Sequence, residues 1–276
     1  MSVKIVVDSS VDLAPEVKAQ VKTVALSVLF GEQEYKDGVT INPEKFYEML
    51  VQSEQLPTTS QPTPAAFEDA YRELVEAGHE VLVITIASTL SGTYQSATIA
   101  ADEFPGKVFV LDSRAAAIGS GLLTMSALKL AEEGLSAQQI LEILMEKRKK
   151  IRLFAMVDTL EYLKKGGRLS STVAFVGGVL NLKPIISLEE GQIQVVGKAR
   201  GLKAAFSTLT KVCQETGVDL DEPYLLGYTG SSDENLTKYL AESSELWPAD
   251  SEKLIIGSAI GTHAGPGAVA IAFYGK

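Results

Sequence analysis

A hydroxyl-rich stretch, residues 88–93 (STLSGT), directly follows an apolar run at residues 81–87 that predicts a buried strand. The residues after it, as far as about Ala101, predict a helix, so the stretch lies at a strand-to-helix junction. Hydroxyl groups in such a place could do two kinds of chemistry. Ser91 could be a nucleophile, or the hydroxyls and the unpaired backbone N–H groups of the helix N-terminus could bind an anion.

The nucleophile hypothesis lacks its supporting residues. The strained elbow of the α/β-hydrolases has glycines two residues before and after the serine, whereas Thr89 and Thr93 occupy those positions around Ser91. A serine triad also needs a histidine and a carboxylate, and of the chain's two histidines only His263 is a plausible partner. A serine hydrolase that acts on acyl esters through Ser91 and His263 stays open as the alternative.

Anion binding agrees better with the residue types. Gly92 lets an anion approach the backbone closely, and Ser91 and Thr93 add uncharged donors, although serine and threonine also cap ordinary helices. The loop at residues 56–64 (LPTTSQPTP) adds Thr59 and Ser60, whose movement the neighbouring prolines restrict. These hydroxyls could bind the same anion, or the loop could simply face solvent.

Two further residues could face an anion or a partner. His263 lies in a segment (GTHAGPGA) that predicts a tight turn, where a neutral imidazole could donate to an anion or serve only the turn. Arg168 follows two glycines in KKGGRLS, where the glycines would end one helix and Ser170 could cap the next. An arginine on such a constrained turn suits a phosphate or a partner's carboxylate, or it could pair within its own chain.

The elements that must position these residues alternate between strand and helix. Strands are predicted at residues 3–7, 81–87 and 108–111, each followed by a helix, the first with Asp12 as its N-cap. Asn-Pro at residue 42 and Thr-Pro at residue 63 predict two more helix starts, and residues 24–30 and 34–36 predict a hairpin. The pattern predicts a parallel sheet with helices on both faces, whose strands end at one polar rim that includes residues 88–93.

The second half of the chain has a different order of elements. It predicts a strand at residues 153–157, a short helix to Lys165, another helix after Arg168, a hairpin around residues 190–191, a long helix from Leu202 and three more strands. Because these strands are not cleanly separated by helices, we expect a mixed sheet. The predicted fold is α/β with two domains, residues 1–155 and 156–276.

Composition excludes several classes of function. The net charge of −10 over 276 residues argues against nucleic-acid binding, and a single cysteine argues against disulfides or a thiol-rich metal site. We expect no metal and no cofactor, since the chain has neither a dinucleotide-binding glycine motif nor an ATP-binding Gly-Lys-Ser/Thr loop. Without a leader-like start or a run long enough to span a membrane, the sequence predicts a cytoplasmic protein.

Taken together, six segments in register resemble the DegV family of bacterial fatty-acid-binding proteins. They are VDSSVDL, TTSQPT, ASTLSGTYQSA, LEYLKKGGRLS, LNLKPII and HAGPGAVA, and they cover nearly the whole chain. The resemblance implies two α/β domains with a long-chain fatty acid between them, its acyl chain buried. It also implies a carrier rather than an enzyme, which presents the fatty acid to a separate ATP-dependent fatty acid kinase and carries the acyl phosphate towards phospholipid synthesis.

The family motifs match this sequence residue by residue. The resemblance implies that Thr59, Ser91 and His263 hold the fatty acid carboxylate, with Ser60, Gly92 and Thr93 beside them, and that Arg168 works with the kinase. Contact with a membrane would be at most transient. One departure is Ala87, where members of the family often have serine.

Overall fold

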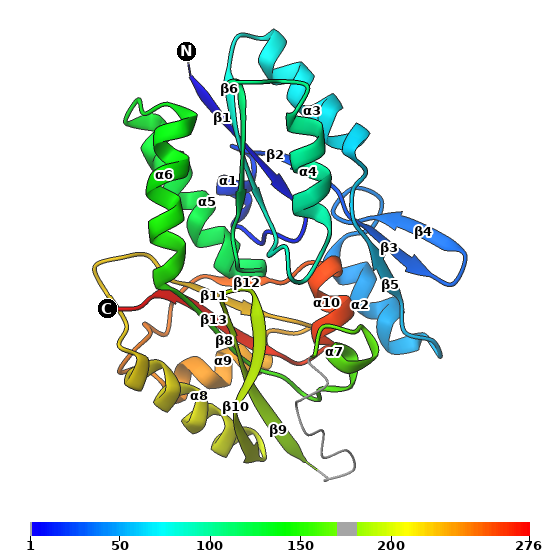
Figure 1. Ribbon diagram of the computed structural model, residues 1–276. Coiled ribbons are helices and arrows are strands. Elements are labelled where there is room, and N and C mark those ends of the chain that lie inside the picture. Colours follow the sequence, from blue (N-terminus) through cyan, green and yellow to red (C-terminus); the bar gives the residue numbers. More distant parts are fainter. Residues whose placement is uncertain (1, 170–180) are drawn as a thin grey trace.

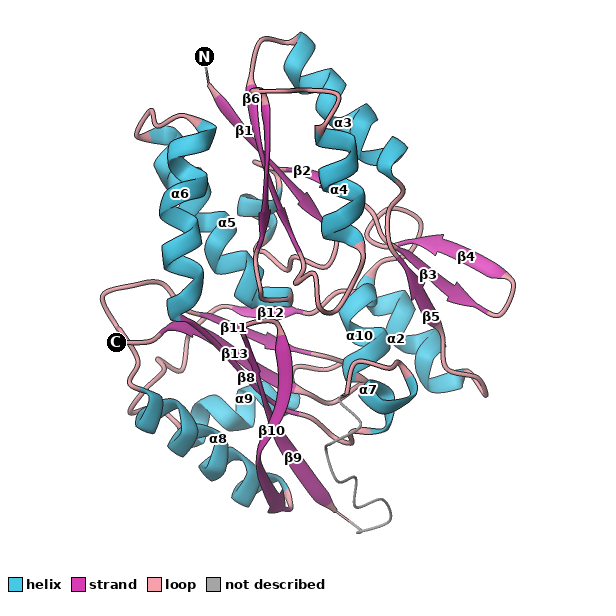
Figure 2. Cartoon of the chain, viewed as in Figure 1, coloured by secondary structure: helices cyan, strands magenta, loops and turns pink. Residues whose placement is uncertain are grey.

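Two sheets, one above the other in Figures 1 and 2, form the core of the protein. The computed structural model describes residues 2–169 and 181–276. The strands are β1 (Val3–Asp8), β2 (Lys22–Val24), β3 (Ser27–Phe30), β4 (Gln33–Lys36), β5 (Thr58–Ser60), β6 (Glu80–Thr85), β7 (Val108–Asp112), β8 (Ile151–Met156), β9 (Leu182–Glu189), β10 (Gln192–Arg200), β11 (Leu225–Tyr228), β12 (Lys253–Ile255) and β13 (Val269–Tyr274). The α-helices are α1 (Pro15–Lys18), α2 (Pro43–Gln52), α3 (Pro64–Glu76), α4 (Thr93–Ala101), α5 (Ala117–Glu132), α6 (Ala137–Lys147), α7 (Glu161–Lys165), α8 (Leu202–Thr216), α9 (Glu234–Glu242) and α10 (Ser258–Ala264).

The first sheet is parallel, in the order β2-β1-β6-β7, with helices on both faces. Alternate residues of a strand point to opposite faces, and β1 shows how each face is buried. Ile5 and Val7 pack in the cluster of α5 and α6, whereas Val6 packs in the cluster of α3 and α4. Figure 1 shows these two helix pairs on either side of the sheet. The predicted alternation of strands and helices is therefore confirmed.

The second sheet is mixed, as predicted, in the order β10-β9-β8-β13-β11-β12. Its pairs are antiparallel except for β11 and β12. The helices α8 and α9 cover one face, and α5 lies against the other face while it also contacts β1 and β6 of the first sheet. A helix between two sheets must be apolar on nearly every side, and α5 is buried along most of its length. Strand β8 (Ile151–Met156) spans the predicted boundary after residue 155, which stays a prediction.

A small antiparallel sheet, in the order β4-β3-β5, lies beside the first sheet. It contains the predicted hairpin, β3 and β4, but Val24 belongs to the separate strand β2. The loop predicted at residues 56–64 was only partly right, because its centre forms β5, in which Thr59 pairs with Val28. The Asn-Pro and Thr-Pro signals were correct: the side chains of Asn42 and Thr63 cap α2 and α3.

Three local predictions need correction or fall outside the described residues. Asp12 is not an N-cap, since α1 begins at Pro15 and Asp12 instead accepts a hydrogen bond from the backbone N–H of Gly257 at 2.8 Å. His263 does not lie in a turn but near the end of α10, which ends before Gly265 at a positive φ of 71°. The helix expected after Arg168, with Ser170 as its cap, lies outside the described residues.

In the part of the chain that the structure describes, no helix is both long and apolar enough to cross a membrane.

Candidate functional site

A cavity lies between the two sheets, with a volume of about 920 Å³ that includes the solvent at its open side. Its wall is mainly alanine, isoleucine, leucine and valine, so it suits an apolar ligand rather than a sugar or nucleotide. The wall includes Leu26, Ile86, Leu90, Ala116, Ala117, Leu153, Ala155, Val157, Leu163, Ile186, Leu188, Ile193, Ile256, Ala259, Ile260, Ala264, Ala268 and Ala270.

The floor of the cavity is a trough of small side chains on the second sheet. Ala155 on β8 and Ala270 on β13 are directly paired, and both line the cavity. The neighbouring residue of β8, Phe154, belongs to the cluster of α8 on the other face. The larger side chains of Ile186 and Leu188 on β9 form the wall beside the trough. Because the alanines of the trough are smaller than the isoleucine and leucine beside them, they leave the space that an extended apolar chain needs.

At one end of the cavity, polar side chains from distant parts of the chain meet, whereas Ser10 and Thr229 are further polar residues of the lining. Thr59 Oγ1 lies 2.9 Å from His263 Nε2, a contact that joins β5 to α10 across 204 residues of sequence. Thr59 lines the cavity together with Ser91, Arg168 and His263, so the structure brings four of the predicted residues together. Ser60 is exposed and does not line the cavity, because successive residues of a strand face opposite ways.

The loop from β6 to α4 supplies Ser91. Its Oγ lies 2.9 Å from Thr93 Oγ1, and Thr93, the first residue of α4, is buried beneath it. Gly92 lies against Gln61, whose Oε1 would be 2.1 Å from a Cβ at residue 92. Gly92 and Thr93 therefore support Ser91 and do not themselves form part of the cavity wall.

His263 is a neutral hydrogen-bonding group. Burial, and secondarily the positive charge of Arg168, lowers its pKa to about 4. Its Nδ1 is buried and has no hydrogen-bond partner among the described residues. Nδ1 would also be 2.2 Å from a Cβ at residue 166, so the absence of a side chain at Gly166 is what allows the ring to lie there.

Arg168 turns towards the same end of the cavity. Its Nε donates to the carbonyl oxygen of Leu90 at 3.1 Å, and its Nη1 donates to the carbonyl oxygen of Gly166 at 2.5 Å. The first bond ties the segment after α7 to the Ser91 loop. The guanidinium is thus the one cation among the cavity's described lining residues, and it is held by its own chain.

These contacts do not form a serine triad. The hydrogen bonds of the described residues join Ser91 to Thr93 and His263 to Thr59, not Ser91 to His263. Moreover, no described carboxylate accepts from His263 Nδ1 to orient the ring. The geometry favours an anion-binding site over a nucleophile.

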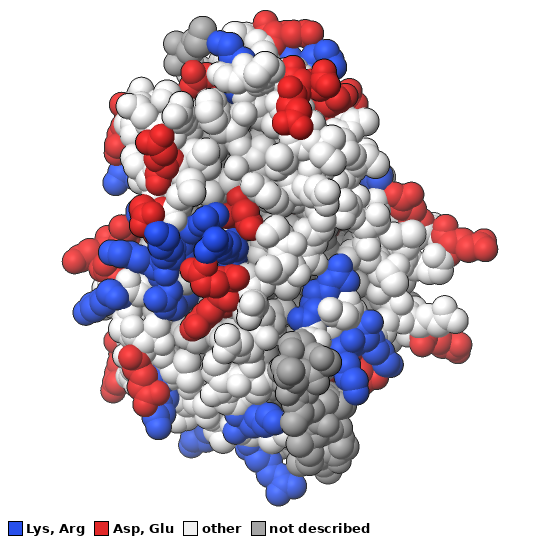
Figure 3. All heavy atoms as spheres, viewed as in Figure 1, with Lys and Arg blue, Asp and Glu red and all other residues white. Residues whose placement is uncertain are grey.

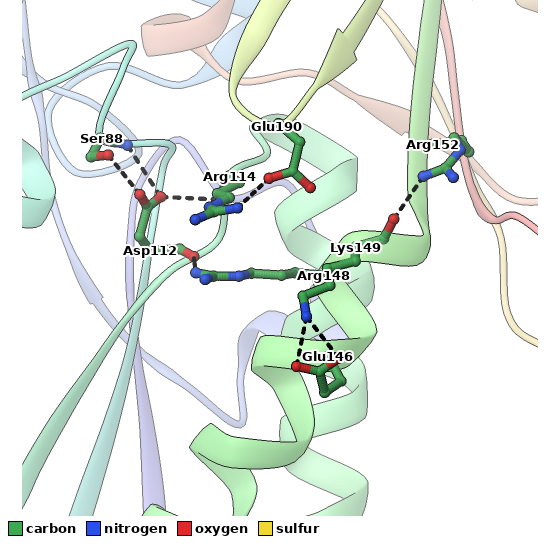
Figure 4. A network of polar contacts seen from close by, with 8 residues as sticks. All are labelled: Ser88, Asp112, Arg114, Glu146, Arg148, Lys149, Arg152 and Glu190. Carbon is green, nitrogen blue, oxygen red and sulfur yellow. Dashed lines mark hydrogen bonds and ion pairs between the residues drawn. The ribbon is translucent and has the colours of Figure 1, made fainter.

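The tip of the β9–β10 hairpin lies against the rim of the first sheet. Thr89 Oγ1 donates to the carbonyl oxygen of Gly191 at 2.5 Å, and Arg114 pairs with Glu190 (Figure 4). Figure 4 also shows Asp112 accepting from Ser88 at the end of β7. Acidic and basic side chains alternate around this contact, as Figure 3 shows beside the lower end of α6, so it is a mixed surface rather than a basic patch. The hairpin is held to the rim of the first sheet by polar contacts.

Sequence reasoning missed the wall of the cavity and three buried carboxylates beside it. The period-two alanines Ala268, Ala270 and Ala272 were a possible signal for a trough. Asp8 accepts from the backbone N–H of Ile86 at 2.7 Å, and Asp12 and Asp37 contact residues 257–259. These partners lie 78 to 245 residues away in sequence, so no local pattern reveals them, although Asp8 also accepts from the nearby Ser10. Among the described residues no group of acidic, histidine and cysteine side chains could hold a metal ion.

Comparisons with known proteins agree with this architecture. The family model described as "Uncharacterised protein, DegV family COG1307" matches residues 2–276. A DegV domain-containing protein of Deinococcus radiodurans is 37% identical over 279 residues, which cover 99% of this chain and 98% of that protein.

Two solved structures are similar over their full lengths. One, from Thermus thermophilus, is described as showing fatty acid binding of a DegV family protein; it has a TM-score of 0.89 and 34% identity, with 100% of both chains covered. The other is the Streptococcus pneumoniae Fatty Acid Kinase (Fak) B3 protein loaded with linoleic acid, with a TM-score of 0.86 and 100% of both chains covered. At 22% identity, that second likeness shows the fold alone. From the family model and the curated relative, the chain belongs to the DegV family.

Proposed function

We propose that this protein binds one long-chain fatty acid, with the acyl chain in the cavity and the carboxylate at its polar end. The carboxylate would accept hydrogen bonds from Thr59, Ser91 and His263, with Gly92 and Thr93 supporting the Ser91 loop. Ser60 would act only through the strand that it shares with Thr59. The observation that carries this proposal is an apolar cavity at one end of which Thr59 and His263 lie 2.9 Å apart, with Ser91 also in the lining. A long apolar chain with one anionic head has the complementary shape and polarity.

The two parts of the site would have different tasks. Each buried methylene of the acyl chain contributes about 0.8 kcal/mol, so the apolar wall would supply most of the affinity. The uncharged donors would orient the carboxylate without the deep electrostatic trap that several buried cations would make. A carrier needs such an arrangement, because its ligand's head group must stay available for reaction.

We further propose that the protein is not itself an enzyme and presents the fatty acid to a separate kinase, which makes the acyl phosphate. The family resemblance supports this, and so does the position of Arg168, whose guanidinium lies beside the site where a phosphoryl group would arrive. The protein would work in the cytoplasm, with at most transient membrane contact, and needs no cofactor of its own. The division into domains at residues 155 and 156 remains part of the same proposal.

Native mass spectrometry of the purified protein tests the first part. We expect a co-purified mass in the range of long-chain fatty acids, released by denaturation, and submicromolar affinity when the stripped protein is titrated. A generic acyl ester assay is the control for the hydrolase alternative. Failure of stripped protein to bind any fatty acid would overturn the proposal, as would ester turnover that Ser91→Ala abolishes.

The kinase part is tested with Arg168→Ala and a fatty acid kinase supplied with ATP. We expect fatty acid affinity within about threefold of the original protein and a much slower phosphoryl transfer. If the variant lost fatty acid affinity but the fatty acid still bound were phosphorylated at the normal rate, Arg168 would instead be assigned to closing the cavity. Lys165→Ala, on the neighbouring exposed end of α7, is the matched control.

A further inference from the structure

The two side chains that meet at the polar end of the cavity belong to separate units of the fold. Thr59 lies on β5 of the small sheet, whereas His263 lies on α10, which follows β12 of the second sheet. Their 2.9 Å contact requires that α10 have one position and one rotation relative to the small sheet. A residue that fixes α10 to that sheet therefore affects the site without touching a ligand.

Asp37 makes this connection. It directly follows β4, and its backbone N–H donates to the carbonyl oxygen of Leu26 at 2.9 Å, so it is fixed to the small sheet. Its Oδ1 accepts from the backbone N–H of Ser258 at 3.1 Å, and its Oδ2 accepts from that of Ala259 at 3.3 Å. Both carboxylate oxygens thus hold the first turn of α10.

The length of α10 makes its start decisive. The helix has seven residues, and His263 lies five residues after Ser258, which is about 7.5 Å along the helix axis. The ring thus lies fewer than two turns beyond the residues that Asp37 holds, so a shift of the first turn reaches it over a short stretch of helix. The opposite side of the helix is confined as well, since a Cβ at Gly261 would be 2.5 Å from Tyr47 Oη.

A carboxylate in this place costs stability. Asp37 is only 3% exposed, none of the ion pairs between described residues includes it, and burial raises its pKa. A serine would cap the helix at a lower desolvation cost, but with one oxygen. The two oxygens of the planar Asp37 carboxylate contact two successive N–H groups of α10. They therefore fix the rotation of the helix as well as its position.

We propose that Asp37 is a positioning residue of the carboxylate site: by holding Ser258 and Ala259 it aims His263 at Thr59. The proposal rests on the proposed function, since it assumes that the ligand has a carboxylate at this end. It predicts that Asp37 affects recognition of the head group and not of the acyl chain.

The experiment compares palmitate with hexadecanol, which has the same chain length and an uncharged head, by displacement of a fluorescent fatty acid. Asp37→Asn keeps the side chain's shape but places an amide N–H₂ group against a backbone N–H. We expect palmitate affinity to fall about tenfold or more, because hydrogen bonds to a charged acceptor are the stronger ones, and hexadecanol affinity to change less than about threefold. The NMR signals of the His263 ring should shift in the same variant.

Asp12→Asn is the matched control. It removes a buried carboxylate at the same junction, yet it keeps an oxygen that can accept from the N–H of Gly257. Its palmitate and hexadecanol affinities should equal those of the original protein.

Ser258→Pro is the second variant, in case Asp37→Asn does not fold. Proline is favoured at the first helical position, and Gly257 has an extended conformation that a following proline accepts. This variant removes one of the two N–H groups that contact Asp37 and should likewise weaken palmitate more than hexadecanol. Equal losses for both ligands, or unchanged palmitate affinity in both variants, would overturn the positioning role. A failure of the proposed function is a separate result, since the original protein would then not bind palmitate.

Discussion

At the scale of single residues, Ser91 is the side chain whose role is simplest to isolate. Ser91 lines the cavity, and its hydroxyl contacts Thr93 Oγ1. Ser91→Ala should weaken fatty acid binding by about 1.5–3 kcal/mol, roughly ten- to hundredfold, because a donor to a carboxylate is lost. Titration measures the affinity, and thermal unfolding should show a nearly unchanged melting temperature.

Thr98→Ala provides the control for this variant. Thr98 lies on α4, the helix that follows the Ser91 loop, and donates to the carbonyl oxygen of Tyr94; it does not line the cavity. Its loss should leave fatty acid affinity unchanged. An Ser91→Ala protein that melts normally and binds normally would remove Ser91 from the carboxylate site.

His263 predicts a pH dependence of folding. Its pKa is lowered to about 4, against roughly 6.5 in the unfolded chain. Between these values the unfolded state takes up a proton that the folded state does not, so the stability that the neutral ring allows is fully present above about pH 6.5 and is lost as the pH falls towards 4. Urea unfolding at several pH values should show this loss of stability in the original protein and a smaller loss in His263→Gln, which has no imidazole to protonate. The same pH slope in both proteins would mean that the ring is not buried as a neutral group.

At the same scale, the sequence could predict which residues meet but not how each is oriented. Thr59, Ser91, Arg168 and His263 were expected from their motifs, and they lie together. Ser60 was expected beside them, yet it faces outwards because its segment is a strand and not a loop. The orientation depends on pairing with β3, about thirty residues earlier in the chain, which a local pattern does not contain.

At the scale of elements, the end of α7 limits the position of α10. Gly166 has an ordinary helical φ of −72°, so alanine suits its backbone, but a Cβ there would be 2.2 Å from His263 Nδ1. Gly166→Ala should displace the ring and weaken fatty acid binding about tenfold, the effect of one lost hydrogen bond. Lys165→Ala, which shortens an exposed side chain next to it, is the control in the same titration. Unchanged binding by Gly166→Ala would show that α7 can move without disturbing the site.

The paired strands β8 and β13 determine how much chain fits in the trough. Leucine in place of Ala270 would fill space opposite Ala155. If two or three methylenes lose their burial, affinity for the longest acids should fall by about 2 kcal/mol, whereas shorter acids should bind nearly as before. A series of saturated acids of increasing length measures this directly. A uniform loss over the series would place the acyl chain elsewhere in the cavity.

The elements themselves were predictable to different degrees. Helices α2 and α3 begin where Asn-Pro and Thr-Pro indicate, and the β9–β10 hairpin turns at Glu190 and Gly191, because these signals act within a few residues. Asp12 looked like a helix cap by its local sequence, but its partner is Gly257. The prediction was wrong because the competing interaction comes from the far end of the chain.

At the scale of the whole molecule, the two halves are joined by a shared helix and by buried carboxylates. The apolar surface of α5 packs against both sheets, which supplies non-directional attraction. The carboxylates supply direction, since Asp12 and Asp37 each reach from the first third of the chain to residues 257–259. The position of one half relative to the other is thus set by hydrogen bonds to a few backbone groups.

Asp12 should therefore make the stability of the whole fold depend on pH. Burial, with a smaller contribution from the charge of Asp37, raises its pKa to about 8, and its Oδ2 has no hydrogen-bond partner among the described residues. The unfolded chain releases this proton near pH 4, so the stabilising contribution is complete below about pH 4 and is lost as the pH rises through 8. Between pH 6 and 8 the folded protein should lose about 2 kcal/mol from this group alone.

Asp12→Asn tests this contribution, because asparagine keeps the acceptor for Gly257 and cannot ionise. Urea unfolding at pH 6, 7 and 8 should show a smaller loss of stability for the variant than for the original protein. Asp69→Asn, an exposed substitution on α3, should behave like the original protein at each pH. If the stability of Asp12→Asn changed with pH in the same way as that of the original protein and of Asp69→Asn, Asp12 would be ionised in the folded state at neutral pH. The junction between the halves would then contain a buried charge that its hydrogen bond to Gly257 and the more distant charge of Lys18 are sufficient to stabilise.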